Sequence, residues 1–217
     1  MASPLFRARM RHLLAAGMLS LAVPAVAGVY EDILVAANEN QTAKVVELLQ
    51  RGMDVNTSDR DGDTLALIAA RNGNNDLLDF LLRNRANVLK QNKYGDSPIM
   101  AATMQGHADA VRRLLAAGAD VHNKGWNALH YAAYSGHTEI ARLLIEHMAD
   151  LDARAPNGQT PLMLAASAGY LDVVKLLVDN DADMDLEDAD GHTAINLAER
   201  NGHADVVDYL RSEGASE

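Results

Sequence analysis

The stretch GQTPLMLAASAGYLDVVKLLVDNDADMD, residues 158–185, contains the pattern that decides the fold. It opens with a glycine, continues through a short apolar run that a second glycine ends, and has a second apolar run before an aspartate-rich close. Thr160 is a good helix N-cap, and Pro161 follows at the first helical position, where a missing N–H costs nothing. The stretch therefore predicts two short helices in succession, followed by a turn.

The same phrase occurs five times along the chain. The opening glycines are spaced by 33, 30, 33 and 33 residues. They begin the segments GDTLALIAARNG, GDSPIMAATMQG, GWNALHYAAYSG, GQTPLMLAASAG and GHTAINLAERNG, at Gly62, Gly95, Gly125, Gly158 and Gly191. Pairs of alanines within these segments are small enough to let neighbouring helices approach closely. Because one such unit cannot bury both of its apolar faces alone, the sequence predicts units that stack side by side.

With these features the chain resembles the ankyrin-repeat family, most clearly in residues 158–185 and in NALHYAAYSGHTEIARLLIEHMADLD, residues 127–152. The resemblance implies an all-α solenoid of about six stacked helix-turn-helix units with short hairpin loops. The first and last units are expected to act as caps. The approximate units are residues 29–61, 62–94, 95–124, 125–157, 158–190 and 191–217.

The chain departs from the family pattern where the second helix of a unit ends. Glycine stands there in some units, as at Gly52 and Gly118, but three units have Arg85, Met148 or Asp181 instead. A non-glycine residue held at φ > 0 costs on the order of 1 kcal/mol. We therefore expect the middle units to be less stable than those of an ideal array.

The first 27 residues have a different composition from the rest. Three arginines without any acid come before an uncharged, mostly apolar run, and Pro24 precedes the small residues of AVA, residues 25–27. This order is typical of a secretory signal peptide that is cut between Ala27 and Gly28. We therefore expect residues 28–217 to be exported to a bacterial periplasm or secreted. An uncleaved membrane anchor is the alternative, since the uncharged run is nearly long enough to span a bilayer.

Charge and cysteine content restrict the partners. The chain has 19 Lys and Arg against 30 Asp and Glu, a net charge of −11. Removing the three arginines of the signal peptide leaves 16 against 30, or −14. Such a surface repels nucleic acid and anionic lipid and favours a basic protein partner, unless its acidity serves only solubility. The absence of cysteine excludes disulfides and thiolate chemistry. We expect a mature monomer without membrane contact.

No set of residues predicts catalysis, a cofactor or a metal site. There is no phosphate-binding glycine loop and no Gly-x-Ser-x-Gly segment. His107, His130, His137 and His203 occupy scaffold positions of the ankyrin pattern. The acidic run DRDGD, residues 59–63, lacks the remaining ligands of a calcium loop. We therefore predict that the chain is not an enzyme, and an enzyme or small-ligand receptor is the least favoured alternative.

The family resemblance also indicates where a partner binds. Ankyrin repeats usually contact partners through the hairpin tips, the residue after the opening glycine and the two residues before the second glycine. Carried onto this chain, these positions include eight candidate partner-binding residues: Arg71, Tyr94, Asp96, Met104, Lys124, Trp126, Tyr134 and Gln159. Large aromatic side chains at the centre of an interface often contribute about 2 kcal/mol or more to binding.

One hairpin loop is shorter than its counterparts and lies next to the only tryptophan. Between an Asp-Val or Asp-Met pair and the next opening glycine there are three residues at 122–124 but six at 185–190. The shortened loop is expected to leave a notch in the row of hairpins. Trp126 either lines that notch as a pocket for a partner's side chain or only covers the hole.

The sequence thus predicts a non-catalytic protein-interaction module that acts outside the cytoplasm through its inner face and its hairpin tips. Two narrower functions stay open. The acidic charge suggests an inhibitor or immunity protein for a basic exported enzyme. The resemblance to small exported ankyrin proteins of some bacteria implies an accessory factor in oxidative-stress defence linked to catalase.

Overall fold

The computed structural model describes residues 30–215, so the expected signal peptide, residues 1–27, lies outside the described part. A helical stretch over residues 30–38 begins the array. The helices that follow are α2 (Thr42–Gln50), α3 (Leu65–Arg71), α4 (Asn75–Arg83), α5 (Pro98–Met104), α6 (Ala108–Ala116), α7 (Ala128–Ser135), α8 (Thr138–Glu146), α9 (Pro161–Ala168), α10 (Leu171–Val178), α11 (Ala194–Asn201) and α12 (Ala204–Ser212). The expected all-α solenoid is confirmed.

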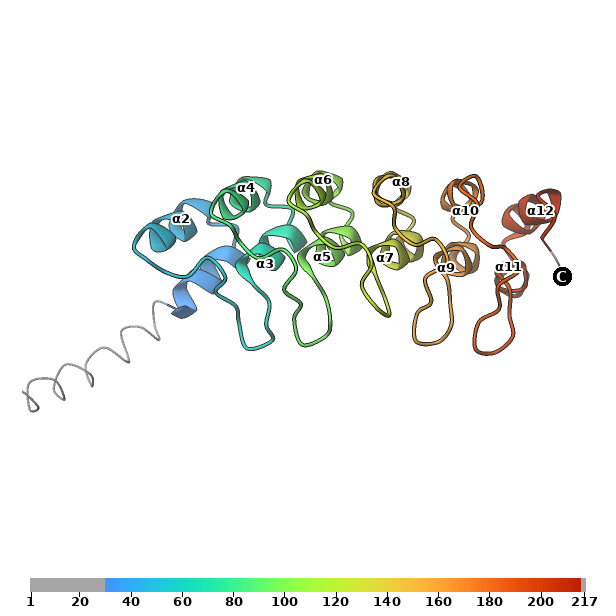
Figure 1. Ribbon diagram of the computed structural model, residues 1–217, viewed down its shortest axis with the longest axis horizontal. Coiled ribbons are helices and arrows are strands. Elements are labelled where there is room, and N and C mark those ends of the chain that lie inside the picture. Colours follow the sequence, from blue (N-terminus) through green and yellow to red (C-terminus); the bar gives the residue numbers. More distant parts are fainter. Residues whose placement is uncertain (1–29, 216–217) are drawn as a thin grey trace, which may run out of the picture.

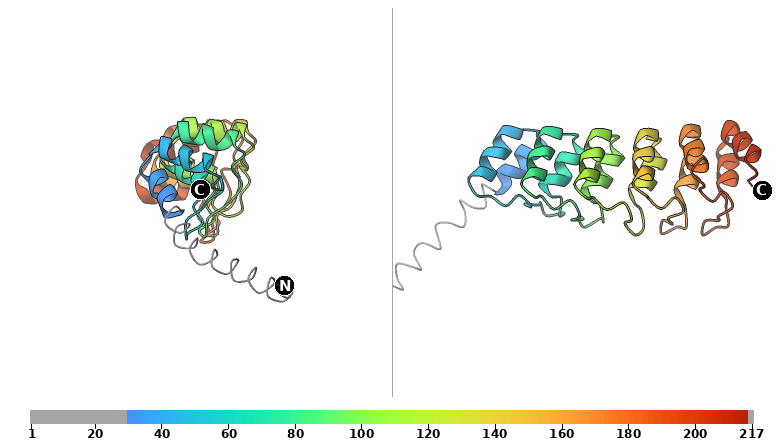
Figure 2. Two further views of the ribbon diagram at one scale, coloured as in Figure 1. Left: turned by 90° about the vertical axis from the view of Figure 1, so that its left-hand side faces the viewer. Right: turned by 45° about the horizontal axis from the view of Figure 1, so that its top comes forward.

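The helices form two layers in a single row (Figure 1). The first helix of each unit, α3, α5, α7, α9 or α11, belongs to an inner layer, and the second helix belongs to an outer layer. The loops that precede the inner helices all project from the same edge of the row (Figures 1 and 2). Within residues 30–215, no helix is long and apolar enough to cross a bilayer.

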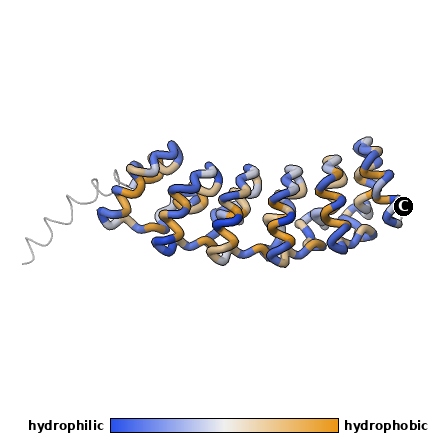
Figure 3. The backbone as a smooth tube through the Cα atoms, turned by 90° about the horizontal axis from the view of Figure 1, so that it is seen from above, coloured by the Kyte–Doolittle hydropathy of each residue, from blue (hydrophilic) through white to orange (hydrophobic). Residues whose placement is uncertain are grey.

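Burial explains why the units must stack. In α3, the six residues Leu65–Ala70 are all buried, whereas α4 buries only one face, through Leu77, Leu78 and Leu81. Hydrophobic segments recur in every helix pair along the row (Figure 3). Burying one such leucine stabilises the fold by about 1.5–3 kcal/mol, and part of that burial is supplied by a neighbouring unit.

The N-caps of the inner helices agree with the sequence pattern at four of five positions. The side chains of Thr64, Asn127, Thr160 and Thr193 each accept a hydrogen bond from the backbone N–H three residues ahead. Ser97 occupies the same place before α5, but its hydroxyl makes no capping bond. The cap of α5 therefore leaves one hydroxyl uncommitted.

The glycine between the two helices of a unit is required by both conformation and space. Gly136 has φ 73°, and a Cβ added to it would lie 2.6 Å from the ring of Tyr170 in the next unit. A Cβ on Gly169 would likewise lie 2.4 Å from the ring of His203. The Nε2–H of His203 donates to the Ser167 carbonyl at 3.1 Å, which supports the scaffold interpretation of this histidine.

The three non-glycine residues at the ends of outer helices adopt the expected left-handed conformation. The φ angles are 63° for Arg85, 63° for Met148 and 69° for Asp181. The N–H of Asp181 donates to the Val178 carbonyl at 3.0 Å and the N–H of Ala182 donates to the Leu177 carbonyl at 3.1 Å, a pair of bonds that accompanies a left-handed residue at a helix end. The strain predicted from the sequence is therefore found at all three positions.

Replacing Asp181 by glycine should stabilise the protein by about 0.5–1 kcal/mol, because glycine adopts φ > 0 without a steric cost. Urea unfolding should show a raised midpoint with little change in slope. Asp179→Gly is a suitable control, since Asp179 has φ −60° and glycine gains nothing there. An unchanged or lowered midpoint for Asp181→Gly would contradict the strain argument.

Candidate partner-binding face

Four aromatic rings meet on and beside helix α7. The Trp126 ring is partly buried and lies 5.3 Å from the Tyr131 ring, 5.8 Å from the Tyr134 ring and 5.9 Å from the His130 ring, centroid to centroid. The Trp126–Tyr134 contact is edge-on, with an interplanar angle of 74°. Tilted and edge-on contacts of this kind are the favoured geometries of aromatic pairs. Trp126 is therefore held against α7 by its own unit.

Tyr131 ties this aromatic group to the preceding unit. Its hydroxyl donates a hydrogen bond to Asp96 Oδ1 at 3.0 Å. Burial, with the negative charge of Asp96 and this hydrogen bond adding to it, raises the pKa of Tyr131 to about 12. The phenol therefore stays protonated and remains a donor near neutral pH. The sequence pattern predicted Asp96 and Trp126 as site residues but missed Tyr131, which connects them.

A hollow continues the aromatic group along the inner face. Its volume is about 490 Å³, and its lining is Met104, Gln105, Tyr134, Ser135, His137, Ala168 and Tyr170. The exposed fractions of Met104, Tyr134 and Tyr170 are 42%, 58% and 39%. No carboxylate, lysine or arginine is among these lining residues. We call Met104, Trp126, Tyr131, Tyr134 and Tyr170 the aromatic face.

Tyr170 is a second residue of this face that the sequence analysis did not select. It stands after the mid-unit glycine, where three other units have a histidine: His107, His137 and His203. A tyrosine at a position where other units have histidine was the feature of the sequence that could have identified this residue. Because the Tyr170 ring covers Gly136 and is also 39% exposed, it serves the packing and the surface together.

The remaining predicted site residues lie on the tips and at the ends of the inner layer. Arg71 forms an ion pair with Asp63, so its guanidinium is held within its own unit. Tyr94 is 69% exposed, with the Lys93 ammonium 4.9 Å from its ring centre. Lys124 is exposed, and Gln159 accepts a hydrogen bond from Asn157 Nδ2 at 2.9 Å. These residues are not part of the aromatic face.

Backbone hydrogen bonds give the hairpin tips a regular form. We number the tips as hairpin 1 (58–63), hairpin 2 (91–96), the short loop (121–126), hairpin 4 (154–159) and hairpin 5 (187–192). In each numbered hairpin one N–H donates to the carbonyl four residues ahead, at 2.9–3.1 Å. The donor and acceptor residues are Asp59 and Asp63, Asn92 and Asp96, Ala155 and Gln159, and Asp188 and His192.

Neighbouring hairpins are also bonded to each other, except around the short loop. The Lys93 N–H donates to the Asp61 carbonyl at 2.8 Å, and the Ala189 N–H donates to the Asn157 carbonyl at 3.0 Å. The short loop has neither type of bond. The corresponding donor in hairpin 4 is Pro156, which has no N–H. Figure 1 shows that the loop before α7 reaches less far than the others, which is the shortening expected from the sequence.

The lining of this notch is polar rather than aromatic. On one side it forms a hollow of about 350 Å³ lined by His122, Asn123, Lys124, Gly125, Asn127, Asp150, Ala153 and Arg154. Trp126 is not among these residues and lies against Tyr131 and Tyr134 instead. The idea that Trp126 floors the notch is therefore wrong for this hollow, because the indole packs along α7.

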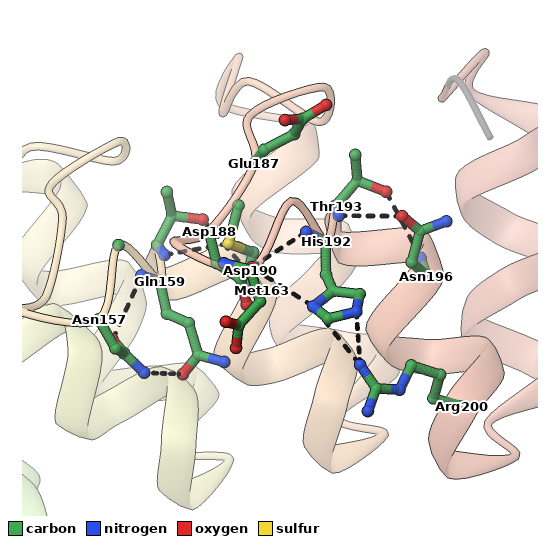
Figure 4. Close-up of polar contacts among 12 residues, drawn as sticks. Asn157, Gln159, Met163, Glu187, Asp188, Asp190, His192, Thr193, Asn196 and Arg200 are labelled. Carbon is green, nitrogen blue, oxygen red and sulfur yellow. Dashed lines mark hydrogen bonds and ion pairs between the residues drawn. The ribbon is translucent and has the colours of Figure 1, made fainter.

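One cluster has the composition of a metal site but is explained by hairpin 5 itself. Ligand atoms of Asp188, Asp190 and His192 lie within 4.8 Å of one another (Figure 4). Asp188 Oδ1 accepts the backbone N–H groups of Asp190 at 2.9 Å and His192 at 3.0 Å. Burial opposes the charge of Asp188, but these two hydrogen bonds lower its pKa. Arg200 Nη1 lies 2.6 Å from His192 Nε2, so a guanidinium cation already lies against this imidazole.

Asp188 has counterparts in other hairpins that confirm its structural role. Asp59 Oδ1 accepts N–H bonds from Asp61 and Asp63, and Asn92 Oδ1 accepts the same two bonds in hairpin 2. Because an asparagine serves equally well, the position requires a side-chain oxygen acceptor and not a metal ligand. The cluster is therefore explained by the turn of hairpin 5.

His130 is a fully buried link between two units. Its Nε2–H donates to the Gln159 carbonyl at 3.3 Å, and its Nδ1 takes part in the cap with Asn127. Burial lowers the pKa of His130 below the ordinary value of 6.5. The folded protein therefore keeps this imidazole neutral at a pH where the unfolded chain binds a proton.

This difference predicts a loss of stability in mild acid. The stabilising contribution is complete above the unfolded pKa of 6.5 and is lost as the pH falls below it, because only the unfolded state takes up the proton. His130→Gln keeps the capping pattern and should reduce the fall in urea midpoint between about pH 7 and 5. His122→Gln, at an exposed position, is the control and should keep the wild-type pH dependence. Equal pH dependence in both variants would refute the assignment.

These features define an elongated scaffold of stacked helix pairs with exposed aromatic side chains on its inner face. A family model that describes three consecutive ankyrin repeats matches the chain over four overlapping stretches. These are residues 33–124, 66–155, 116–188 and 149–216. The chain therefore belongs to the ankyrin-repeat family. Ankyrin repeats generally mediate protein–protein interaction and are typically non-catalytic.

Curated relatives share the repeats and little else. The chain is 32% identical over 138 residues to the putative palmitoyltransferase ZDHHC13 of Danio rerio, covering 61% of this chain and 21% of that protein. It is 33% identical over 142 residues to the nuclear factor NF-kappa-B p105 subunit of Gallus gallus, covering 61% and 14%. It is 36% identical over 104 residues to the human ankyrin repeat and KH domain-containing protein 1, covering 46% and 4%. The chain thus spans less than a quarter of each of these three relatives.

Proposed function

We propose that this chain is a non-catalytic ankyrin-repeat protein that acts outside the cytoplasm and binds a partner protein through the aromatic face. The observation that carries the proposal is the exposure of Met104, Tyr134 and Tyr170 around one uncharged hollow of a strongly acidic protein. The centre of a protein interface is typically depleted of charge and enriched in aromatic residues and methionine. The aromatic face has that composition.

Rigidity of the face is a further support. Tyr134 and Trp126 contact each other, and Trp126 also rests on Tyr131, whose hydroxyl is fixed by Asp96. Side chains that are already ordered lose less conformational entropy when a partner binds. The half-exposed Tyr134 can therefore act as an anchor at low entropic cost.

The charge at the two ends of the hairpin row favours a basic partner. Hairpin 1 carries three aspartates and one arginine, and hairpin 5 carries one glutamate and two aspartates. This arrangement supports the narrower proposal of an inhibitor or immunity protein for a basic exported enzyme. Of these acids, Glu187 and Asp190 are exposed, whereas Asp63 is buried and paired with Arg71. Exposed charges steer association and are screened beyond about 8 Å at physiological ionic strength.

The partner can be captured from the envelope fraction, identified by mass spectrometry and then purified. Trp126→Ala should weaken its binding about thirtyfold, or roughly 2 kcal/mol, and Tyr134→Ala should also weaken it. Because the two rings touch, the double variant should lose less than the sum of the single losses. Calorimetric titration measures affinity, and circular dichroism shows that each variant is folded.

Met148→Ala is the matched control, since Met148 is 79% exposed at the end of the outer helix α8 and outside the aromatic face. Its affinity should equal that of the wild type. If Trp126→Ala instead lowers the melting temperature while the affinity of folded protein is unchanged, Trp126 is only structural and the face is not the binding site.

Export is proposed from the arginine-rich start and the AVA segment before Gly28, which the described residues do not include. N-terminal sequencing of the protein from its native cells should give Gly28 as the first residue. A cytosolic protein that begins at Met1 or Ala2 would contradict the proposed location. It would not affect the proposed aromatic face, because that face lies wholly within residues 104–170.

A further inference from the structure

A second hollow beside the short loop faces hairpin 2. Its volume is about 680 Å³, and it lies where the row of bonded hairpins is interrupted. Most of the lining comes from the base of hairpin 2 and from the short loop: Val88, Leu89, Gln91, Ser97, Gly118, Ala119, Asp120, Val121, His122, Asn123 and His147. Asp120 is the one carboxylate in this lining, and no lysine or arginine accompanies it. We call this space the loop pocket.

Two oxygens in the loop pocket lining lack a hydrogen-bond partner. Within residues 30–215, Ser97 Oγ and Asn123 Oδ1 are buried without one. Ser97 is only 3% exposed, and its hydroxyl makes no capping bond, unlike the other inner-helix caps. An unpaired buried polar group typically costs about 1–3 kcal/mol. Rotation of either side chain toward the pocket would break no hydrogen bond, so both are free to meet a donor.

The protein itself shows what fills the equivalent space one unit earlier. Lys90 Nζ donates to Ser58 Oγ at 3.2 Å, and Ser58 pairs with the N-cap residue Thr64 through an isolated β-bridge. A lysine from the following loop thus lies beside the N-cap of α3. Lys90 is partly buried, so its aliphatic stem also covers the surface there.

The short loop cannot supply that lysine. Counted from Val88 and Val121, which stand at equivalent places, Asn123 takes the position of Lys90. Its side chain is shorter and carries no charge, and its oxygen is left without a partner. The space beside the N-cap residue Ser97 therefore lacks the lysine that lies beside the N-cap of α3.

We propose that the loop pocket binds a lysine or arginine side chain of a protein partner. The inference rests on the proposed function, and it adds the chemistry of one contact. The aliphatic stem would lie along Val88 and Val121, as long basic side chains commonly do on apolar surface. The cationic head would meet the carboxylate of Asp120 and the oxygens of Ser97 and Asn123. The net charge of −11 attracts such a partner from a distance.

The test begins with a random-peptide display library selected on the immobilised, folded protein. Enriched peptides should carry at least one lysine or arginine. Replacing that residue by norleucine, which keeps a stem and removes the charge, should weaken binding at least tenfold by fluorescence titration. Unchanged affinity after this replacement would overturn the proposal.

A matched pair of variants tests whether the basic residue reaches the loop pocket. Asp120 Oδ1 accepts the His122 N–H at 2.8 Å, and Asp183 Oδ1 accepts the Asp185 N–H at 3.0 Å, so both aspartates hold the same kind of turn. Asparagine can accept either bond. Asp120→Asn should weaken the lysine- or arginine-dependent binding about fivefold or more, whereas Asp183→Asn should not. Equal effects of the two variants would mean that general electrostatic attraction, and not a contact in the loop pocket, strengthens the binding. That result would overturn the pocket assignment.

A loop graft gives the sharpest outcome. Replacing residues 122–124 by LKQNKY, residues 89–94 of the preceding loop, restores the full hairpin length and supplies a lysine at the position of Lys90. This variant should unfold at a higher urea concentration than the wild type, because the pocket is filled from within. It should also lose the difference in affinity between lysine or arginine peptides and their norleucine versions. Persistence of that difference in the graft would refute the proposal.

The two proposals fail in distinguishable ways. Peptides that depend on Tyr134 but on no basic residue would sustain the aromatic face and overturn the loop pocket. A selection without any enrichment over a non-repeat control protein would count against both.

Discussion

Packing between consecutive inner helices is the interaction on which the rest of the structure depends. The residues of α3 from Leu65 to Ala70 are all buried, because α4 of the same unit and α5 of the next unit both pack against this helix. The mid-unit glycines make this approach feasible: a side chain at Gly136 would collide with the ring of Tyr170. Stability in such an array comes from nearest-neighbour contacts, so each unit depends on the units beside it.

Because the helix layers carry the stability, the hairpin row can be altered without losing the fold. The hairpins are bonded in two pairs, through Lys93 to Asp61 and through Ala189 to Asn157. Between these pairs, the short loop and Pro156 remove the bonds that would continue the row. The units on either side remain joined by α5, α7 and α9. A break in the tips is thus compatible with a continuous core, and it opens space where the outer surface can be specialised.

The fold could be predicted from the sequence because each of its determinants is local. The N-cap residues, the prolines at the first helical position and the glycines at φ > 0 act within a few residues, and their spacing fixes the unit length. Even the strain at Asp181 was visible as a departure from the glycine pattern. The candidate site was only partly predictable. The pattern placed Trp126 and Tyr134 on the inner layer, but it could not show which way the indole turns, because that depends on Tyr131 and on its bond to Asp96 in another unit.

The distribution of charge separates two physical roles on one surface. The acidic residues of hairpins 1 and 5 lie at the ends of the row, whereas the hollow of the aromatic face has no charged lining and the tips of the short loop and hairpin 4 carry no acid. Exposed charges act mainly on the rate of association, and desolvated aromatic contacts act mainly on the rate of dissociation. An acidic frame around an uncharged centre can therefore attract a basic protein from a distance and still hold it through apolar contacts.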